Sequence, residues 1–304
     1  MLPDDFGNSA DEQRLREFAW WMYERQEIFR KRFVEEQEPP WTDNEILKNY
    51  HFCHTFRELD RGSRYLINNI INRRDNRDVF FNVIFYRLLN LPESYEAAGG
   101  FTRVEDFDED VVVSQLRAYQ EDHPVFSPAY RVSAHKFADS DSKVENIIRG
   151  VLGEVHDQIE HYFEQVEGLD DMGMVTTELI EIQGIGGFLA YEIATDLSYG
   201  FMDIHENDFV NIGPGAEAGM QRILGEGDID FIYWVVDHQD EIFDLHGFDF
   251  YSWNGCEWKD LTLRDVEHSL CEYNKFRRAK QKSNPNLRLF EAIPGEQLDM
   301  NDFK

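Results

Sequence analysis

Three glycines lie close together in the stretch IQGIGGFLAYEIATDLSY, residues 182–199, and their spacing could hold an anion. Gly184, Gly186 and Gly187 permit a sharp reversal with positive φ angles and exposed backbone N–H groups. Apolar residues recur at helical spacing after the turn, so the turn leads into a helix. The N–H groups at the start of that helix are suited to a nucleic-acid phosphate. The alternative interpretation is an ordinary corner between two helices.

A second glycine-rich stretch, NIGPGAEAG at residues 211–219, precedes another apolar helical segment. Gly213 and Gly215 could cradle a phosphate at the start of that helix. The same glycines could equally form a tight capped turn.

The charge of the chain is strongly acidic, with 60 acidic and 30 basic residues and a formal net charge of −30. An acid excess spread along the whole chain, with few lysines, is typical of a protein kept soluble in very high salt, so we predict a halophilic source. Two segments depart from this pattern: residues 57–87 are rich in arginine, and residues 273–290 contain six cations and no acid. Because aromatic residues are interleaved with both, they are predicted to bind a polyanion. An ion-pair network and a solvated tail are the respective alternatives.

The composition limits the class of protein. The chain has 304 residues, of which 42% are hydrophobic, and this is enough for a globular core. No apolar run is long enough to span a membrane, and the N-terminus does not resemble a signal peptide. The three cysteines, Cys53, Cys256 and Cys271, favour a reducing, cytoplasmic environment.

Several common catalytic motifs are missing from the sequence. Nothing matches the phosphate-binding pattern GxxxxGK[ST], so P-loop kinase chemistry is not expected. The patterns HExxH and CxxC are also absent, and the sequence predicts no metal site and no cofactor.

Helical periodicity dominates the chain and predicts a single, mainly α domain over residues 1–304. Helices are expected over residues 12–95, followed by an irregular acidic insert over 100–142. A helix-hairpin-helix core is expected over 143–225, and C-terminal helices with a basic tail over 229–290.

Two helix starts carry the pattern of a capping box, in which two side chains satisfy each other's backbone N–H groups. They are Thr42 with Glu45, and Thr262 with Asp265. The first also has Trp41 and Ile46 placed as a hydrophobic staple.

The hairpin IQGIGGFLA resembles the LPGVGxxxA hairpin of the helix-hairpin-helix DNA glycosylases. It keeps two glycines and the alanine, but Gln183 replaces the proline. In those enzymes a catalytic aspartate follows the hairpin, and Asp208 falls near that position here. Glu206 competes with Asp208 for this role.

Four stretches together resemble one particular family. They occur in the same order as in the family and cover nearly the whole chain: PPWTDNEIL (39–47), FCHTFRELDRGSRYLINNI (52–70), NIGPGAEAG (211–219) and TLRDVEHSLCEYNKFRR (262–278). The family is the helical domain named for 5-hydroxymethyluracil DNA kinases, which includes the α-glutamyl/putrescinyl thymine pyrophosphorylases. One departure is His54, where the family usually has asparagine.

The resemblance implies enzymology on DNA bases in a fold like that of the helix-hairpin-helix DNA glycosylases. The implied reaction displaces pyrophosphate from an activated 5-hydroxymethylpyrimidine with an amine. A flipped, activated base needs stacking aromatic rings, and its leaving pyrophosphate needs cations. The candidate cations are Arg57, Arg61, Lys275 and Arg278.

Three carboxylates are candidates to orient the amine or accept its proton: Asp60, Asp208 and Glu272. The structural alternative is a buried ion-pair lattice in which Arg57, Asp60 and Glu272 join the first and last helices.

The sequence therefore predicts a DNA base hypermodification enzyme. Its expected partners are DNA, a small amine donor and a 5-hydroxymethyluracil DNA kinase, with no membrane partner. Two alternatives stay open: a glycosylase that excises a modified base through Asp208, and a DNA-binding module without catalysis.

Overall fold

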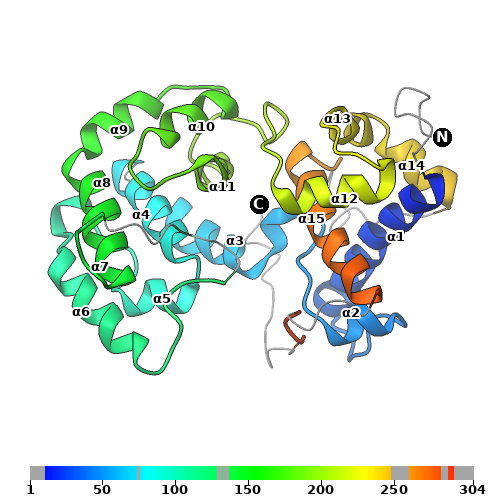
Figure 1. Cartoon of the computed structure of the whole chain (residues 1–304), viewed down its shortest axis with the longest axis horizontal. Coiled ribbons are helices and arrows are strands. Elements are labelled where there is room, and N and C mark those ends of the chain that lie inside the picture. The colour runs from blue at the N-terminus through cyan, green and yellow to red at the C-terminus, as the bar shows by residue number, and fades with distance from the viewer. Residues whose placement is uncertain are drawn as a thin grey trace. The chain divides into compact units, whose positions relative to one another are not determined.

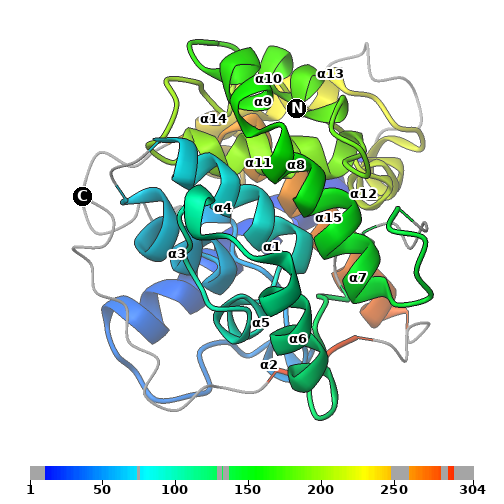
Figure 2. The same ribbon diagram turned by 90° about the vertical axis from the view of Figure 1, so that its left-hand side faces the viewer.

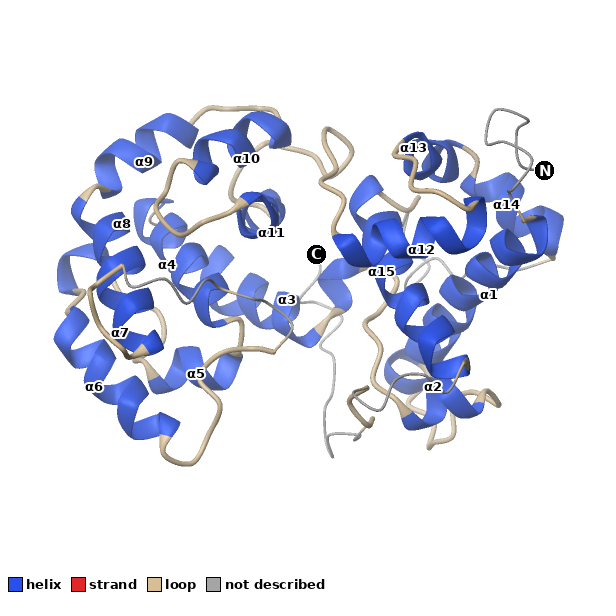
Figure 3. Cartoon of the chain, viewed as in Figure 1, coloured by secondary structure: helices blue, strands red, loops and turns tan. Residues whose placement is uncertain are grey.

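The computed structural model describes residues 11–73, 76–128, 132, 137–247, 260–281 and 287–290. Helices make up 65% of the chain, which confirms the predicted mainly α fold class. Figure 3 shows helices and loops without a strand in this part of the chain. Its one backbone ladder contact is an isolated antiparallel bridge between Tyr50 and Leu289.

The chain divides into two compact units. Unit 1 comprises Met1–Asp60 and Ile212–Lys304, and unit 2 comprises Arg61–Asn211. The boundaries between the units fall after Asp60 and after Asn211.

The described residues of unit 1 form six α-helices, which lie in its N-terminal and C-terminal segments. They are accompanied by the short helices η2 (Arg30–Val34) and η3 (Arg57–Leu59). The α-helices are α1 (Glu12–Phe29), α2 (Glu45–Asn49), α12 (Pro214–Leu224), α13 (Asp230–Asp237), α14 (Gln239–His246) and α15 (Leu263–Lys280), of which the first two precede unit 2 in sequence.

Helix α12 lies directly against α15 in unit 1 (Figure 1). At the crossing, a Cβ added to Gly219 would lie 2.3 Å from the backbone oxygen of Leu270, which is closer than real contacts allow. A Cβ on Gly215 would similarly lie 2.4 Å from the Sγ atom of Cys271. These two glycines therefore allow the helix backbones to approach closely.

The start of α15 confirms one sequence prediction and the start of α2 contradicts another. Thr262 and Asp265 form the predicted capping box, with the Asp265 N–H donating to Thr262 Oγ1 at 3.2 Å and the Thr262 N–H donating to Asp265 Oδ2 at 3.0 Å. Helix α2 is instead capped by Asn44, whose Oδ1 accepts from Ile46 N at 3.0 Å. Thr42 caps the preceding turn by accepting from the Asn44 N–H, so the predicted Thr42 cap was two residues early.

Unit 2 is built around α4 (Asn76–Leu89), in which every residue from Asp78 to Leu89 is buried. A helix that is buried on all sides is a core element rather than an amphipathic surface helix. The helices before and beside it are α3 (Arg61–Leu66), η4 (Ile67–Ile71), α5 (Pro92–Ala97), η5 (Val104–Asp106) and α6 (Glu109–Gln120).

The second half of unit 2 begins with the helical run of α7 (Lys143–Ile147), η6 (Ile148–Leu152) and α8 (Gly153–Asp157), which follow one another without a gap (Figure 2). Helices α9 (Ile159–Val166), α10 (Met172–Ile180) and α11 (Gly187–Ser198) complete it. The segment 100–142, predicted to be irregular, contains the twelve-residue helix α6, whose Val112, Val113 and Leu116 are buried.

Helices α10 and α11 flank the glycine turn at residues 184–187. Gly184 in the turn has φ +83°, and a Cβ there would lie 2.7 Å from Cγ2 of Val151. This glycine is therefore required both by the backbone angle and by close packing. None of the helices described is long and apolar enough to cross a membrane.

Candidate active site

Unit 1 brings the segment 52–60 against helix α15, and most of the predicted chemical groups meet there. The start of α15 holds this segment directly, because Asp265 Oδ1 accepts from the Arg57 N–H at 3.0 Å. Asp265 therefore caps its own helix and anchors the neighbouring segment with the same carboxylate.

Asp60 lies at the centre of this contact. Its Oδ1 accepts from the His54 N–H at 2.9 Å, and its Oδ2 lies 3.3 Å from Nε2 of His268 on α15. Burial opposes the charged form, but the contact with His268 and the nearby His54 and Arg57 outweigh it and lower the pKa of Asp60 below its usual range. Asp60 is therefore ionised at neutral pH, although its side chain is only 16% exposed.

Glu272 lies one helical turn beyond His268 on α15 and is almost fully buried. Its Oε2 accepts from the Cys53 N–H at 3.1 Å, and its other oxygen forms an ion pair with Lys275. Burial alone would raise the pKa of Glu272. The positive charges of Lys275 and His268 have the larger opposite effect, so the pKa of Glu272 is lowered overall. The same pair raises the pKa of Lys275, chiefly through the charge of Glu272. The side chain of Lys275 remains 39% exposed.

Arg25 from α1 supports the segment from inside unit 1. Its Nη2 donates to the carbonyl oxygen of Phe52 at 2.9 Å and its Nε to that of Cys53 at 3.0 Å. The backbone of Cys53 is thus held at its N–H by Glu272 and at its carbonyl by Arg25. Burial, together with Asp60 and Glu272, raises the pKa of the Cys53 thiol well above its usual range.

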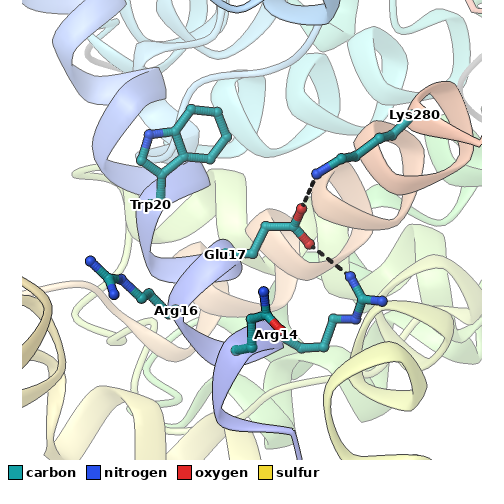
Figure 4. A pocket seen from close by; sticks show the side chains of 6 residues that line it. Arg14, Arg16, Glu17, Trp20 and Lys280 are labelled. Atoms are coloured by element: carbon teal, nitrogen blue, oxygen red, sulfur yellow. Dashed lines mark hydrogen bonds and ion pairs between the residues drawn. The ribbon is translucent and has the colours of Figure 1, made fainter.

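A pocket of about 470 Å³ lies elsewhere in unit 1, between the start of α1 and the end of α15 (Figure 4). Its lining includes Arg14, Arg16, Trp20 and Lys280 around the carboxylate of Glu17. Glu17 accepts from Lys280 Nζ at 2.7 Å and pairs with Arg14 at 3.3 Å. Cations beside an indole ring are the side chains that bind phosphates and stack on bases.

The other predicted phosphate ligands of unit 1 differ in exposure and in contacts. Arg57 is 5% exposed, whereas Arg278 is exposed near the end of α15. The N–H of Gly213 donates to Glu267 Oε1 at 3.2 Å, and Gly215 faces Cys271. The predicted phosphate cradle at α12 therefore already has a carboxylate at its first N–H group. Of the acid-free segment, residues 282–286 lie outside the described residues.

The remaining predicted residues belong to unit 2. Arg61 is half exposed and pairs with Glu93. Asp208 is exposed, and its Oδ2 accepts from the His205 N–H at 2.8 Å in a short turn. The structure thus assigns Asp208 to a different unit from Asp60 and Glu272.

The predicted phosphate turn of unit 2 is open at two of its three glycines. Gly186 caps α11 with extended backbone and without a side-chain hydrogen bond, and a Cβ added there would contact nothing within 4 Å. Gly187 begins the helix, and its carbonyl accepts from Asn211 Nδ2 at 3.1 Å.

Sequence analysis missed Cys53, His268 and Arg25 as members of the site. One signal was present, because His268, Glu272 and Lys275 recur at i, i+4 and i+7 and therefore share a face of α15. No local pattern connects this face with Cys53 or Arg25.

The structure is a helical fold with buried carboxylates and cations along α15. The family described as "5-hmdU DNA kinase, helical domain" matches residues 12–285. The chain belongs to this family, which confirms the resemblance found in the sequence.

A curated relative from Bacillus phage SP10, named "5-hmdU DNA kinase", is 28% identical over 306 residues. The match covers 90% of this chain and 47% of the relative, so the chain spans about half the length of that protein. No solved structure matches the chain. The likeness to helix-hairpin-helix DNA glycosylases therefore stays a prediction.

Proposed function

We propose that this protein takes part in the hypermodification of DNA bases at 5-hydroxymethyluracil. The proposal rests on the family and on the name of the phage relative. We further propose that it transfers an amine onto a 5-hydroxymethylpyrimidine that has already been activated as a pyrophosphate ester. In this reaction the amine nitrogen bonds to the 5-methylene carbon and the carbon–oxygen bond to pyrophosphate breaks. The electron pair leaves with the pyrophosphate, and the nitrogen loses its proton to solvent water.

One observation supports the transfer step most strongly: a fixed carboxylate and an accessible cation lie in the same cluster. Asp60 stays ionised at neutral pH, so it can hold the ammonium group of an amine donor. A carboxylate with a lowered pKa is a poor proton acceptor, since general bases work best with a pKa near the working pH. We therefore assign Asp60 to positioning the donor and not to removing its proton.

Lys275 supplies the cation for the leaving pyrophosphate. Its side chain is 39% exposed, and Glu272 holds it in place from the buried side. Because Glu272 is itself 2% exposed, we assign it to positioning Lys275 instead of contacting substrate. Arg57, Arg61 and Arg278 remain further proposed phosphate ligands.

The hairpin of unit 2 is proposed to contact the DNA backbone. Its glycine turn leaves the first N–H groups of α11 without a side-chain cap, and Phe188 beside them is 42% exposed. Uncapped N–H groups at a helix start attract a phosphate. Gly184 shapes the turn, and Gly186 and Gly187 present the N–H groups.

Nucleoside mass spectrometry on DNA containing pyrophosphorylated 5-hydroxymethyluracil, incubated with the protein and a pool of amines, tests the proposal. An amine-bearing thymidine is the expected product, and Asp60→Asn should reduce its yield at least tenfold. Release of free modified base would instead establish the glycosylase alternative, which Asp208→Asn should then abolish. Asp203→Asn, another exposed acid of unit 2, is the matched control. DNA that binds without any change would leave only the binding module.

A further inference from the structure

Three side chains of unit 1 bring metal-binding atoms together. The Cys53 Sγ, a carboxylate oxygen of Asp60 and a ring nitrogen of His268 all lie within 4.8 Å of one another. All three residues are half-buried. Among the residues that the structure describes, this is the one group of three such side chains that converges.

The ring nitrogen of His268 gives a second, independent observation. Its Nε2 is buried and makes no hydrogen bond with another described group, although it lies 3.3 Å from Asp60 Oδ2. Charge-assisted hydrogen bonds between nitrogen and carboxylate oxygen are usually about 2.7–2.9 Å long. Two donors on one tetrahedral zinc ion, each bonded at about 2.0–2.1 Å, lie about 3.3–3.4 Å apart. The observed separation is thus one that two ligands of a shared ion would have.

The surroundings of the three donors are already ordered. The His54 N–H fixes Oδ1 of Asp60, which leaves Oδ2 directed at His268. Glu272 and Arg25 hold both polar backbone groups of Cys53. Hydrogen bonds that orient the ligands in this way are the usual outer shell of a protein metal site.

We propose that Cys53, Asp60 and His268 bind one divalent transition-metal ion of the zinc type, with a fourth position left open. Thiolate, imidazole and carboxylate are the donors that zinc takes from proteins. Three protein ligands and one exchangeable position are typical of catalytic zinc sites, whereas structural sites have four protein ligands. The sequence analysis expected no metal, because the ligands come from distant parts of the chain and form no motif.

The role of such an ion, unlike its binding, rests on the proposed function. An open metal position beside Lys275 could polarise a phosphoryl oxygen and stabilise the leaving pyrophosphate. Asp60 would bind the ion through Oδ2, which faces His268, and could still hold the amine donor through Oδ1, since a carboxylate oxygen accepts more than one hydrogen bond.

Metal binding by the full chain tests the inference without any measurement of activity. The protein is stripped with a chelator, loaded with Zn²⁺ or Co²⁺ and desalted, and bound metal is measured by mass spectrometry. We expect about one ion per chain, and a thiolate-to-cobalt charge-transfer band with the strong visible absorption of tetrahedral cobalt. Cys53→Ser should remove the charge-transfer band, and Asp60→Asn should weaken binding about tenfold or more.

Cys271→Ser is the matched control, since Cys271 is also a half-buried cysteine but faces Gly215. It should keep both the ion and the cobalt spectrum. Folded wild-type protein without stoichiometric metal would overturn the proposal, as would equal loss of metal in Cys271→Ser and Cys53→Ser. Circular dichroism shows whether each variant is folded. If Cys53→Ser does not fold, metal binding by Asp60→Asn is the test instead. If Asp60→Asn keeps its metal but loses amine transfer, Asp60 is not a metal ligand. The metal proposal is then wrong, while the proposed role of Asp60 in holding the donor is supported.

Discussion

Removing one charge from the core of unit 2 should be among the most damaging single changes to this protein. Arg87 on α4 and Asp196 on α11 form an ion pair whose side chains are 2% and 0% exposed. The same guanidinium also donates through Nη1 to Asn90 Oδ1 at 2.7 Å. Asp196→Asn keeps the size of the side chain but leaves the buried guanidinium without its counter-charge.

Breaking a buried pair by removing one partner typically costs about 3–5 kcal/mol. The total stability of a domain is about 5–15 kcal/mol, so this is a large fraction of it. With a urea m-value of about 3 kcal/mol/M, the midpoint for unfolding of unit 2 should fall by about 1–1.7 M. Replacing both Arg87 and Asp196 by leucine should recover most of the loss, since a hydrophobic pair leaves no unpaired charge in the core.

Urea unfolding followed by far-ultraviolet circular dichroism measures the change, and a transition for each unit is to be expected if the two unfold separately. Glu105→Gln is the matched control, because its pair with Arg103 is 68% exposed on both sides and should contribute about 0.5 kcal/mol or less. A loss below about 1 kcal/mol for Asp196→Asn would refute the reasoning that this pair is shielded from water.

Three further predictions follow from packing and charge. Gly219→Ala should lower the stability of unit 1 by about 1–3 kcal/mol or more, because the added Cβ would lie 2.3 Å from the Leu270 backbone oxygen. Gly186→Ala should change stability little, because a Cβ there contacts nothing within 4 Å. Thermal melts of both variants check this. Burial opposes the charged form of Glu17, but Lys280 and its other partners outweigh burial and lower the pKa of Glu17 in the folded protein. Glu17 therefore stabilises the fold fully above its pKa in the unfolded chain, and this contribution is lost as the pH falls through its lower pKa in the folded protein. Glu17→Gln should therefore destabilise the protein at pH 7 and change its stability little in strong acid. Unfolding midpoints of the wild type and the variant, measured at both pH values, check this. An equal loss of stability at both pH values would contradict it. Burial raises the pKa of Cys271 to about 11, so its alkylation by iodoacetamide, measured by peptide mass spectrometry, should be slow at pH 7 and rise steeply toward that pH.

The sequence predicted local features of the fold well where a single segment contains the whole signal. The cap formed by Thr262 and Asp265 is such a case, because both partners lie in one turn. The cap of α2 was predicted two residues early, since Thr42 and Asn44 are both good capping residues and only the path of the chain decides between them. The family was also evident from the sequence, because its motifs are spread over nearly the whole chain.

The chemical site was only partly predictable. Asp60, Glu272 and Lys275 were singled out and do lie in one cluster of unit 1. Their distinct environments could not be inferred, because burial of Glu272 and exposure of Lys275 depend on how α15 meets the segment 52–60. Cys53 could not be linked to His268 for the same reason, since the two are distant in sequence.

The division of the chain has a consequence for the order in which the protein can form during synthesis. Unit 2 is one continuous stretch, Arg61–Asn211, so all of its residues are synthesised before α12. Unit 1 combines residues from both sides of that stretch and must wait for α15. Since domains generally fold as units during translation, unit 2 should fold first while α1 remains without its partner helix. The cluster around Asp60 is then assembled last, because an incomplete nascent chain carries Asp60 and the hairpin of unit 2 but not His268, Glu272 and Lys275 of α15.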